Sequence, residues 1–168
     1  MIIKTGRTGL AARAGHDLTI EITGWSVRVI IPDDGVAAAQ ITAELDLGSL
    51  AVREGTGGAK PLTDKDRGDI ANTARTILRQ PAAAFTSTWV VPAGASGGAI
   101  DGTLTLNGRS QPVRLQVTSP APGRYRGGTT VRQTDFGITP YTGFFGALKL
   151  RDEIGIEFEM DLDRAARE

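Results

Sequence analysis

Three short segments carry the residue types from which a reactive site could be built. His16 and Asp17 form an adjacent ionisable pair that includes the chain's one histidine. Residues 94–98 read Gly-Ala-Ser-Gly-Gly, and residues 55–60 read Gly-Thr-Gly-Gly-Ala-Lys. The first of these matches a serine-nucleophile pattern, and the second faintly suggests a phosphate-binding loop. Each chemistry needs a particular structural context around it.

That context is missing for the serine and for the lysine. A Gly-x-Ser-x-Gly nucleophile sits on a turn from a strand into a helix, with a histidine downstream. Here a strand pattern follows Ser96, and His16 lies far upstream. A phosphate-binding loop has Ser or Thr after its lysine, whereas Pro61 follows Lys60. We interpret both segments as loops, assign no catalytic residue and predict that the chain is not an enzyme.

The histidine leaves two interpretations open. His16 and Asp17 would face opposite sides of a strand, but in a turn both could approach one site. In the structural interpretation the His16 ring hydrogen-bonds to backbone. In the functional one it anchors the polar head group of a ligand at the mouth of a cavity. A single histidine cannot form a histidine-rich metal site, and the chain has no cysteine. We therefore expect no metal and no other cofactor.

The segment from Ile100 to Val117 has the clearest structural pattern in the chain. Apolar and polar residues alternate on both sides of Asn107 and Gly108. Asn-Gly supplies the positive φ angles of a tight hairpin turn, and alternation with a period of two is typical of strands. The segment is therefore predicted to form a β-hairpin with one apolar and one polar face.

The same alternation recurs along most of the chain and predicts about eight antiparallel strands. The other expected strands are residues 10–14, 18–23, 25–31, 41–47, 85–91, 129–134 and 154–162. Closing such strands into a barrel removes the two exposed edges of an open sheet. We thus predict an all-β fold, an antiparallel and roughly eight-stranded lipocalin-like barrel, in a single domain over residues 1–168.

One amphipathic helix, at about residues 63–80, is inserted midway through the strands. Thr63 and Asp66 have the spacing of a variant capping box, and Pro81 ends the helical pattern. Acidic residues gather near its start and arginines near its end, which suits the helix dipole. Such a helix is expected either to lie across the sheet or to plug one end of the barrel.

Composition narrows the possible partners and locations. The chain has 168 residues and balances 19 basic against 19 acidic residues. That balance gives no reason to expect nucleic acid or an anionic membrane as a partner. No apolar run is long enough to span a bilayer, and the first residues lack the apolar core of a signal peptide. We expect a cytoplasmic protein without stable membrane insertion.

Four blocks of the sequence share a pattern with one known family. They are the hairpin block Leu104-Thr105-x-x-Gly108-x-x-x-Pro112-Val113-x-Leu115, residues 78–88, Asp135-Phe136-Gly137-Ile138, and residues 152–157. On these blocks the chain resembles the YceI-like family of small lipocalin-like barrels. The resemblance covers residues from about 10 to 162. It implies a barrel that binds a polyisoprenoid or a similar amphiphilic lipid and has no fixed catalytic motif.

Together these observations predict a non-catalytic carrier or storage protein that holds an apolar-chain lipid in its lumen. The alternative is a structural or interaction barrel with a filled interior and no ligand. A homodimer is possible in either case. Aromatic residues Tyr141, Phe144 and Phe145 are expected at the mouth. The candidate ligand-binding residues are Leu18, Ile20, Trp25, Val27, Phe85, Trp89, Leu104, Leu106, Leu115, Phe144, Phe158 and Met160, with His16 for the head group.

Overall fold

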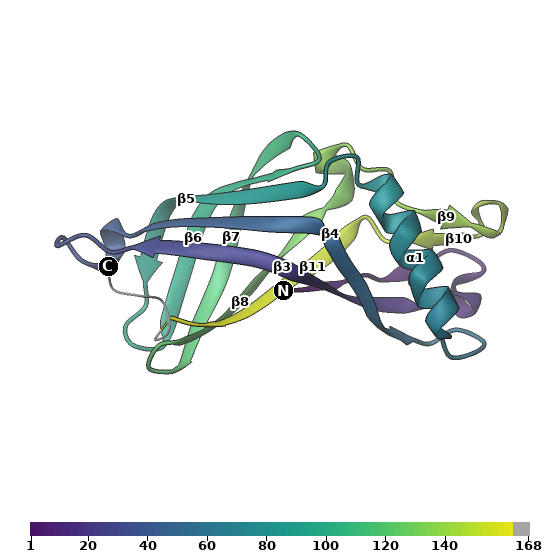
Figure 1. Ribbon diagram of the computed structural model, residues 1–168, viewed down its shortest axis with the longest axis horizontal. Coiled ribbons are helices and arrows are strands. Elements are labelled where there is room, and N and C mark those ends of the chain that lie inside the picture. The colour runs from purple at the N-terminus through teal and green to yellow at the C-terminus, as the bar shows by residue number, and fades with distance from the viewer. Residues whose placement is uncertain (163–168) are drawn as a thin grey trace.

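The computed structural model describes residues 1–162, so the last six residues of the expected domain lie outside it. Eight strands form a closed antiparallel barrel in the order β1-β11-β8-β7-β6-β5-β4-β3. This confirms the predicted fold class. Figure 1 shows this barrel from the side. The strands are β1 (Ile2–Lys4), β3 (Asp17–Ile30), β4 (Gln40–Thr56), β5 (Ala82–Pro92), β6 (Gly97–Leu106), β7 (Arg109–Ala121), β8 (Arg124–Arg132) and β11 (Glu153–Asp161).

The predicted hairpin is formed by β6 and β7. Their register runs from Leu106 opposite Arg109 to Gly97 opposite Thr118. Asn107 and Gly108 both have positive φ angles, as their turn requires. On the outer face the polar residues pair across strands, for example Arg114 with Asp101 at 3.0 Å. Such exposed pairs each contribute little to stability, so the inward apolar face is what holds the sheet together.

Two register irregularities decide which side chains face inward. The pairing of β3 with β4 shifts between Ile22 and Gly24, at the gap between the strands expected at residues 18–23 and 25–31. The pairing of β5 with β6 shifts between Ser87 and Trp89. An extra residue reverses the alternation beyond it. Trp89 is consequently 65% exposed, while its neighbour Val90 is buried. The expectation that Trp89 faces the lumen is therefore wrong.

A small second sheet lies beside one end of the barrel. It contains β2 (Arg7–Thr8), β10 (Leu148–Leu150) and β9 (Thr142–Gly143), paired in that order. Short 3-10 helices accompany it, η1 (Ala12–Ala14), η3 (Gln133–Phe136) and η4 (Phe144–Gly146), while η2 (Val36–Ala38) lies between β3 and β4. The expected strand at residues 10–14 is thus wrong. The first barrel strand is β1, whose three residues were too few to show an alternation.

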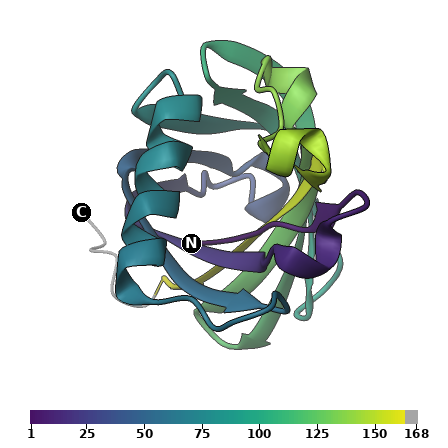
Figure 2. The ribbon, with the colours of Figure 1, turned by 90° about the vertical axis from the view of Figure 1, so that its right-hand side faces the viewer.

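The helix α1 (Asp64–Ile77) lies at the same end of the barrel as the small sheet, and Figure 2 shows it crossing one side of that end. Its capping box is formed as predicted. The Thr63 hydroxyl accepts from the Asp66 amide at 3.2 Å, and the Asp66 carboxylate accepts from the Thr63 amide at 2.9 Å. The Thr63 hydroxyl also donates to the Asp66 carboxylate at 2.7 Å, and this bond, followed by the one from the Thr63 amide, holds the pKa of the Asp66 carboxyl below its usual value. Arg75 then fixes α1 to β4 by donating to the carbonyls of Gly48 and Leu50.

The apolar face of α1 closes a packed core at this end, which we call the packed end. Ala71 of α1 is buried there, with Ile70, Ala74 and Ile77 packed partly against it. Phe136 of η3 is 1% exposed, and the Asn107 side chain donates to its carbonyl oxygen at 3.2 Å. The other buried members of this core are Leu18, Ile20, Ile22, Ala43, Leu45, Leu47, Leu50, Val52, Ala83, Phe85, Leu104, Leu106, Val131 and Ile138. Within residues 1–162, no helix is long and apolar enough to cross a membrane.

A glycine in β6 makes room for an aromatic ring of the neighbouring strand. A methyl group on Gly102 would lie 2.5 Å from the Thr86 carbonyl oxygen and still closer to the Phe85 ring. We expect Gly102→Ala to lower the unfolding free energy by about 1–3 kcal/mol through overpacking. Gly68→Ala is the matched control, because nothing lies within 4 Å of that helical position. It should raise stability by about 0.5–1 kcal/mol. Urea denaturation measures the unfolding free energy of both variants. Equal changes in the two variants would contradict this role of Gly102.

Candidate functional site

An apolar cavity of about 340 Å³ occupies the barrel at the end opposite α1, which we call the open end. Seven of the eight barrel strands contribute to its wall, and α1 contributes none of the lining. The lumen is therefore divided, with the packed core in one half and the cavity in the other. Eight strands enclose just enough space either to fill the interior or to hold one small ligand. In this barrel, side chains fill the interior at the packed end, and the interior at the open end has space for a small ligand.

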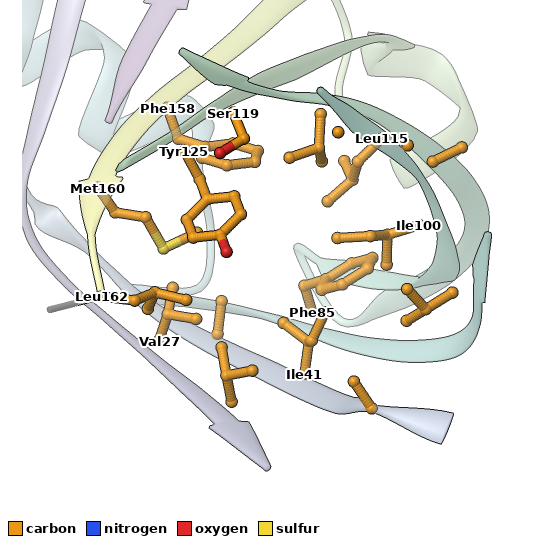
Figure 3. Close-up of a pocket in the computed structure, with 18 of the residues that line it drawn as sticks. Val27, Ile41, Phe85, Ile100, Leu115, Ser119, Tyr125, Phe158, Met160 and Leu162 are labelled. Carbon is orange, nitrogen blue, oxygen red and sulfur yellow. The ribbon is translucent and has the colours of Figure 1, made fainter. Parts of the chain in front are cut away.

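The cavity wall is built from the inward positions of the strands. Figure 3 shows Phe158, Tyr125 and Met160 projecting into the same space as Phe85 and Ile100 on the opposite wall. The strand residues that line it include Trp25, Val27, Val29, Ile41, Ala43, Leu45, Phe85, Val90, Ala99, Ile100, Leu104, Val113, Leu115, Val117, Tyr125, Thr129, Ile156, Phe158 and Met160.

The rim is formed where neighbouring strands are joined at the open end. Ile31 and Val36 come from the connection between β3 and β4, Pro92 is the last residue of β5, and Ala95 comes from the turn between β5 and β6. Ile31 and Val36 are both exposed, so the apolar surface of the cavity continues to the outside. An apolar molecule can therefore enter at this end without first crossing a polar barrier at these positions.

Polar groups are few along this wall. Among the described residues that line the cavity, no side chain carries a formal charge. Tyr125 and Ser119 place hydroxyl groups near the open end, and Figure 3 shows both oxygens beside the cavity. The Ser119 hydroxyl donates to the Ala121 carbonyl at 3.1 Å. No hydrogen bond of the Tyr125 hydroxyl is found within residues 1–162, which leaves it able to bond to a guest.

Seven of the predicted ligand-binding residues line this cavity. They are Trp25, Val27, Phe85, Leu104, Leu115, Phe158 and Met160. Three others, Leu18, Ile20 and Leu106, also face inward but belong to the packed core, so their placement in the site is corrected. Strand alternation gives the direction of a side chain but not its height along the barrel axis.

The aromatic residues expected at the mouth lie at the wrong end of the barrel. Phe144 belongs to η4 beside the small sheet and is 61% exposed, and Phe145 is fully exposed. Tyr141 precedes β9 and is also exposed. These three side chains, like Trp89, do not line the cavity. Their segment follows η3 at the packed end, which no local sequence pattern indicated.

His16 also lies away from the cavity. Its Nε2 atom is 2.7 Å from the Lys60 carbonyl oxygen, and its ring packs where a side chain on Gly58 would have to lie. This geometry is the backbone hydrogen bond of the structural interpretation, and it tethers the loop between β4 and α1. The location of His16 gives no support to a contact with a ligand head group in the cavity.

The two remaining motifs are accounted for by local structure. Ser96 lies in the turn between antiparallel strands β5 and β6, where its hydroxyl donates to the Ala93 carbonyl at 3.1 Å. Gly57 leaves space for the Arg7 guanidinium, which donates to the carbonyls of Gly15 and Thr56. Residues 55–60 are thus packed against the chain's own side chains and present no empty phosphate cradle.

Several lining residues were missed from the candidate set. Val29, Ile41 and Ile156 continue the alternation of residues that were chosen, so the pattern could have identified them. Val90 could not be found this way, because the bulge before it reverses the alternation. Tyr125 lies before the strand expected at residues 129–134, because β8 begins already at Arg124 with a run of mostly polar residues that shows no clear alternation.

A closed antiparallel barrel with one helix and an apolar, end-opening lumen defines a lipocalin-like barrel. The chain belongs to the YceI-like domain family, whose model matches residues 4–162. This confirms the resemblance found in the four sequence blocks. No curated protein matches the chain.

Solved structures agree with this assignment at the level of the fold. Burkholderia cenocepacia BcnA superposes with a TM-score of 0.59 and 19% identity over 94% of this chain and 93% of that one. A Campylobacter jejuni YCEI protein superposes with a TM-score of 0.57 and 14% identity over 84% of this chain and 82% of that one. At these identities the likeness establishes the fold alone.

Proposed function

We propose that this protein is a non-catalytic carrier or store of a polyisoprenoid or similar amphiphilic lipid, held in the cavity at the open end. The observation that supports it is the 340 Å³ apolar space inside a barrel whose other end holds a core of buried apolar side chains. Ligand sites in proteins usually measure about 300–1,000 Å³ and have mostly apolar walls. The YceI-like family points to the same class of ligand.

The wall chemistry suits binding by burial of hydrocarbon. Each methylene moved from water into such a cavity contributes about 0.8 kcal/mol. About ten buried carbons would contribute roughly 8 kcal/mol before ordering costs are subtracted. Binding in the micromolar range is therefore expected for a ligand that also gains contacts at the rim. The alternative, a structural or interaction barrel with a filled interior, would offer no space in which to bury hydrocarbon and so no such gain in binding free energy.

Native mass spectrometry of the purified protein tests the proposal directly. We expect a population whose mass exceeds that of the chain by one lipid, and an organic extract that contains this lipid. Protein stripped of lipid should take up added isoprenols. A chain that carries no lipid after purification and binds no added isoprenol would contradict the proposed role.

The location of His16 leads to a separate prediction. We expect His16→Ala to leave isoprenol affinity unchanged, because the ring contacts the Lys60 carbonyl and not the cavity. Loss of this one hydrogen bond should lower the unfolding free energy by about 0.5–1.5 kcal/mol. Displacement of a fluorescent apolar probe and urea denaturation measure the two quantities. A tenfold loss of affinity with unchanged stability would instead favour a head-group role for His16.

A further inference from the structure

The inner end of the cavity is closed by a row of buried side chains. Ala43, Phe85 and Leu104 are cross-strand neighbours on β4, β5 and β6, and they belong both to the cavity wall and to the buried core. Beyond this row, Ala83 on β5 and Leu106 on β6 belong to the core alone, whereas on β4 the cavity reaches one inward residue further, to Leu45. A chain that enters at the open end therefore meets a floor at Phe85 and Leu104.

The volume above this floor sets how much hydrocarbon can be enclosed. A cavity of about 150 Å³ holds one benzene molecule, or about 25 Å³ for each carbon. By that ratio the 340 Å³ cavity encloses about 14 carbons. This corresponds to a chain of two or three isoprene units, and a longer polyisoprenoid would have to leave its remaining carbons in water.

The open end favours a particular kind of head group. The described lining offers the hydroxyls of Tyr125, Ser119 and Thr129 but no charged side chain to pair with an ionised head. The α-ammonium group of Met1, another lining residue, donates to the carbonyl of buried Ile22 at 3.2 Å. Arg124, next to Tyr125, is on the outer face, where it donates to Asp161 at 3.1 Å. An ion taken into this apolar space without a partner would be strongly disfavoured, whereas a hydroxyl or carbonyl can bond to Tyr125.

We propose that the cavity selects a single apolar chain of about 10–15 carbons that carries an uncharged hydrogen-bonding head. The tail lies against Phe85 and Leu104, and the head lies at Tyr125. This inference rests on the proposed lipid-binding function and narrows its ligand class to short-chain alcohols, phenols or similar neutral amphiphiles.

A series of n-alcohols of about six to eighteen carbons tests the length limit by displacement of a fluorescent apolar probe. Affinity should rise about fourfold for each added methylene, which is the factor equivalent to 0.8 kcal/mol. The rise should stop near 14 carbons, where the enclosed space is full. Failure of every alcohol to bind would overturn the lipid-binding function itself. A rise that continues unchanged to the longest chain would overturn only the length limit.

Substitutions at the floor should move the stopping point. Leu104→Ala should extend it by about three carbons, the number of carbon atoms removed from the side chain. Leu106→Ala is the matched control. It lies on the same strand and face with the same 8% exposure, but outside the cavity. We expect it to leave the stopping point unchanged. Ala43→Leu fills the cavity from β4, where Ala43 lies opposite Phe85. It should lower the stopping point by about three carbons, which tests the limit without emptying the core. A stopping point that neither Leu104→Ala nor Ala43→Leu moves, or that Leu106→Ala moves as far as Leu104→Ala does, would overturn the assignment of the floor.

The preference for an uncharged head group is tested by comparing an alcohol with a carboxylate of the same chain length. At a pH where the acid is ionised, dodecanol should bind at least tenfold more tightly than dodecanoate. Tyr125→Phe should weaken dodecanol severalfold and leave the affinity of dodecane unchanged. Equal binding of the alcohol and the acid would overturn the choice of an uncharged head, and an unaltered affinity of Tyr125→Phe for dodecanol would overturn the role of the tyrosine.

Discussion

Replacing Phe136 by alanine should lower the unfolding free energy by about 3–5 kcal/mol, the largest stability effect expected of a single change in this protein. The side chain is 1% exposed, and it sits in η3 among the buried residues of the packed end. Its removal leaves a cavity that the surrounding strands can close only partly. Urea denaturation measures the loss, with the slope of the transition as a check that unfolding stays two-state.

Phe145→Ala is the matched control for this prediction. Phe145 is another phenylalanine in a 3-10 helix at the same end of the barrel, but its side chain is fully exposed. Its removal should change the unfolding free energy by less than about 0.5 kcal/mol. Similar losses for the two variants would mean that Phe136 does not hold the packed end together.

The largest effect on ligand binding is expected from a charge placed in the cavity. Leu115 of β7 lines the enclosed space, and it lies beside Ile100, its register partner on the neighbouring strand β6. Leu115→Asp should weaken lipid binding at least hundredfold, because an aspartate in this position either displaces the ligand or is buried without a partner. A penalty of about 3 kcal/mol corresponds to that factor.

The neighbouring residue provides the control for Leu115. Gln116 is exposed on the outer face of the same strand, so Gln116→Asp makes the same new side chain one position away. We expect its lipid affinity to equal that of the unaltered protein. Probe displacement measures both affinities, and circular dichroism establishes that each variant is folded. Retention of tight binding by Leu115→Asp would argue that the ligand lies outside this cavity.

Much of the fold could be predicted from local patterns. Strand alternation, the Asn107-Gly108 turn and the Thr63-Asp66 capping box are each determined by residues close in the sequence, and all three are present in the structure. The expected helix, at about residues 63–80, corresponds to α1 at Asp64–Ile77. Features of this kind need no knowledge of tertiary contacts.

The site was less predictable because its location depends on distances along the barrel. Leu104 and Leu106 have the same residue type, face and burial, yet only Leu104 lines the cavity. The difference arises from tertiary packing, because Ala71 of α1 and Phe136 of η3 join the inward side chains of the strands at the packed end. Trp89 was misplaced for another reason, since the bulge in β5 has no glycine or proline beside it to mark it.

The separation of the packed end from the open end has an evolutionary consequence. The side chains that make the fold cooperative are gathered under α1, whereas turns and short connections such as those bearing Ile31, Val36 and Ala95 frame the entrance. Changes in these connections alter few of the contacts on which folding depends. Natural variation at the entrance can thus accumulate with little loss of thermal stability. The shape of the entrance can therefore diverge among related chains while the barrel architecture is retained.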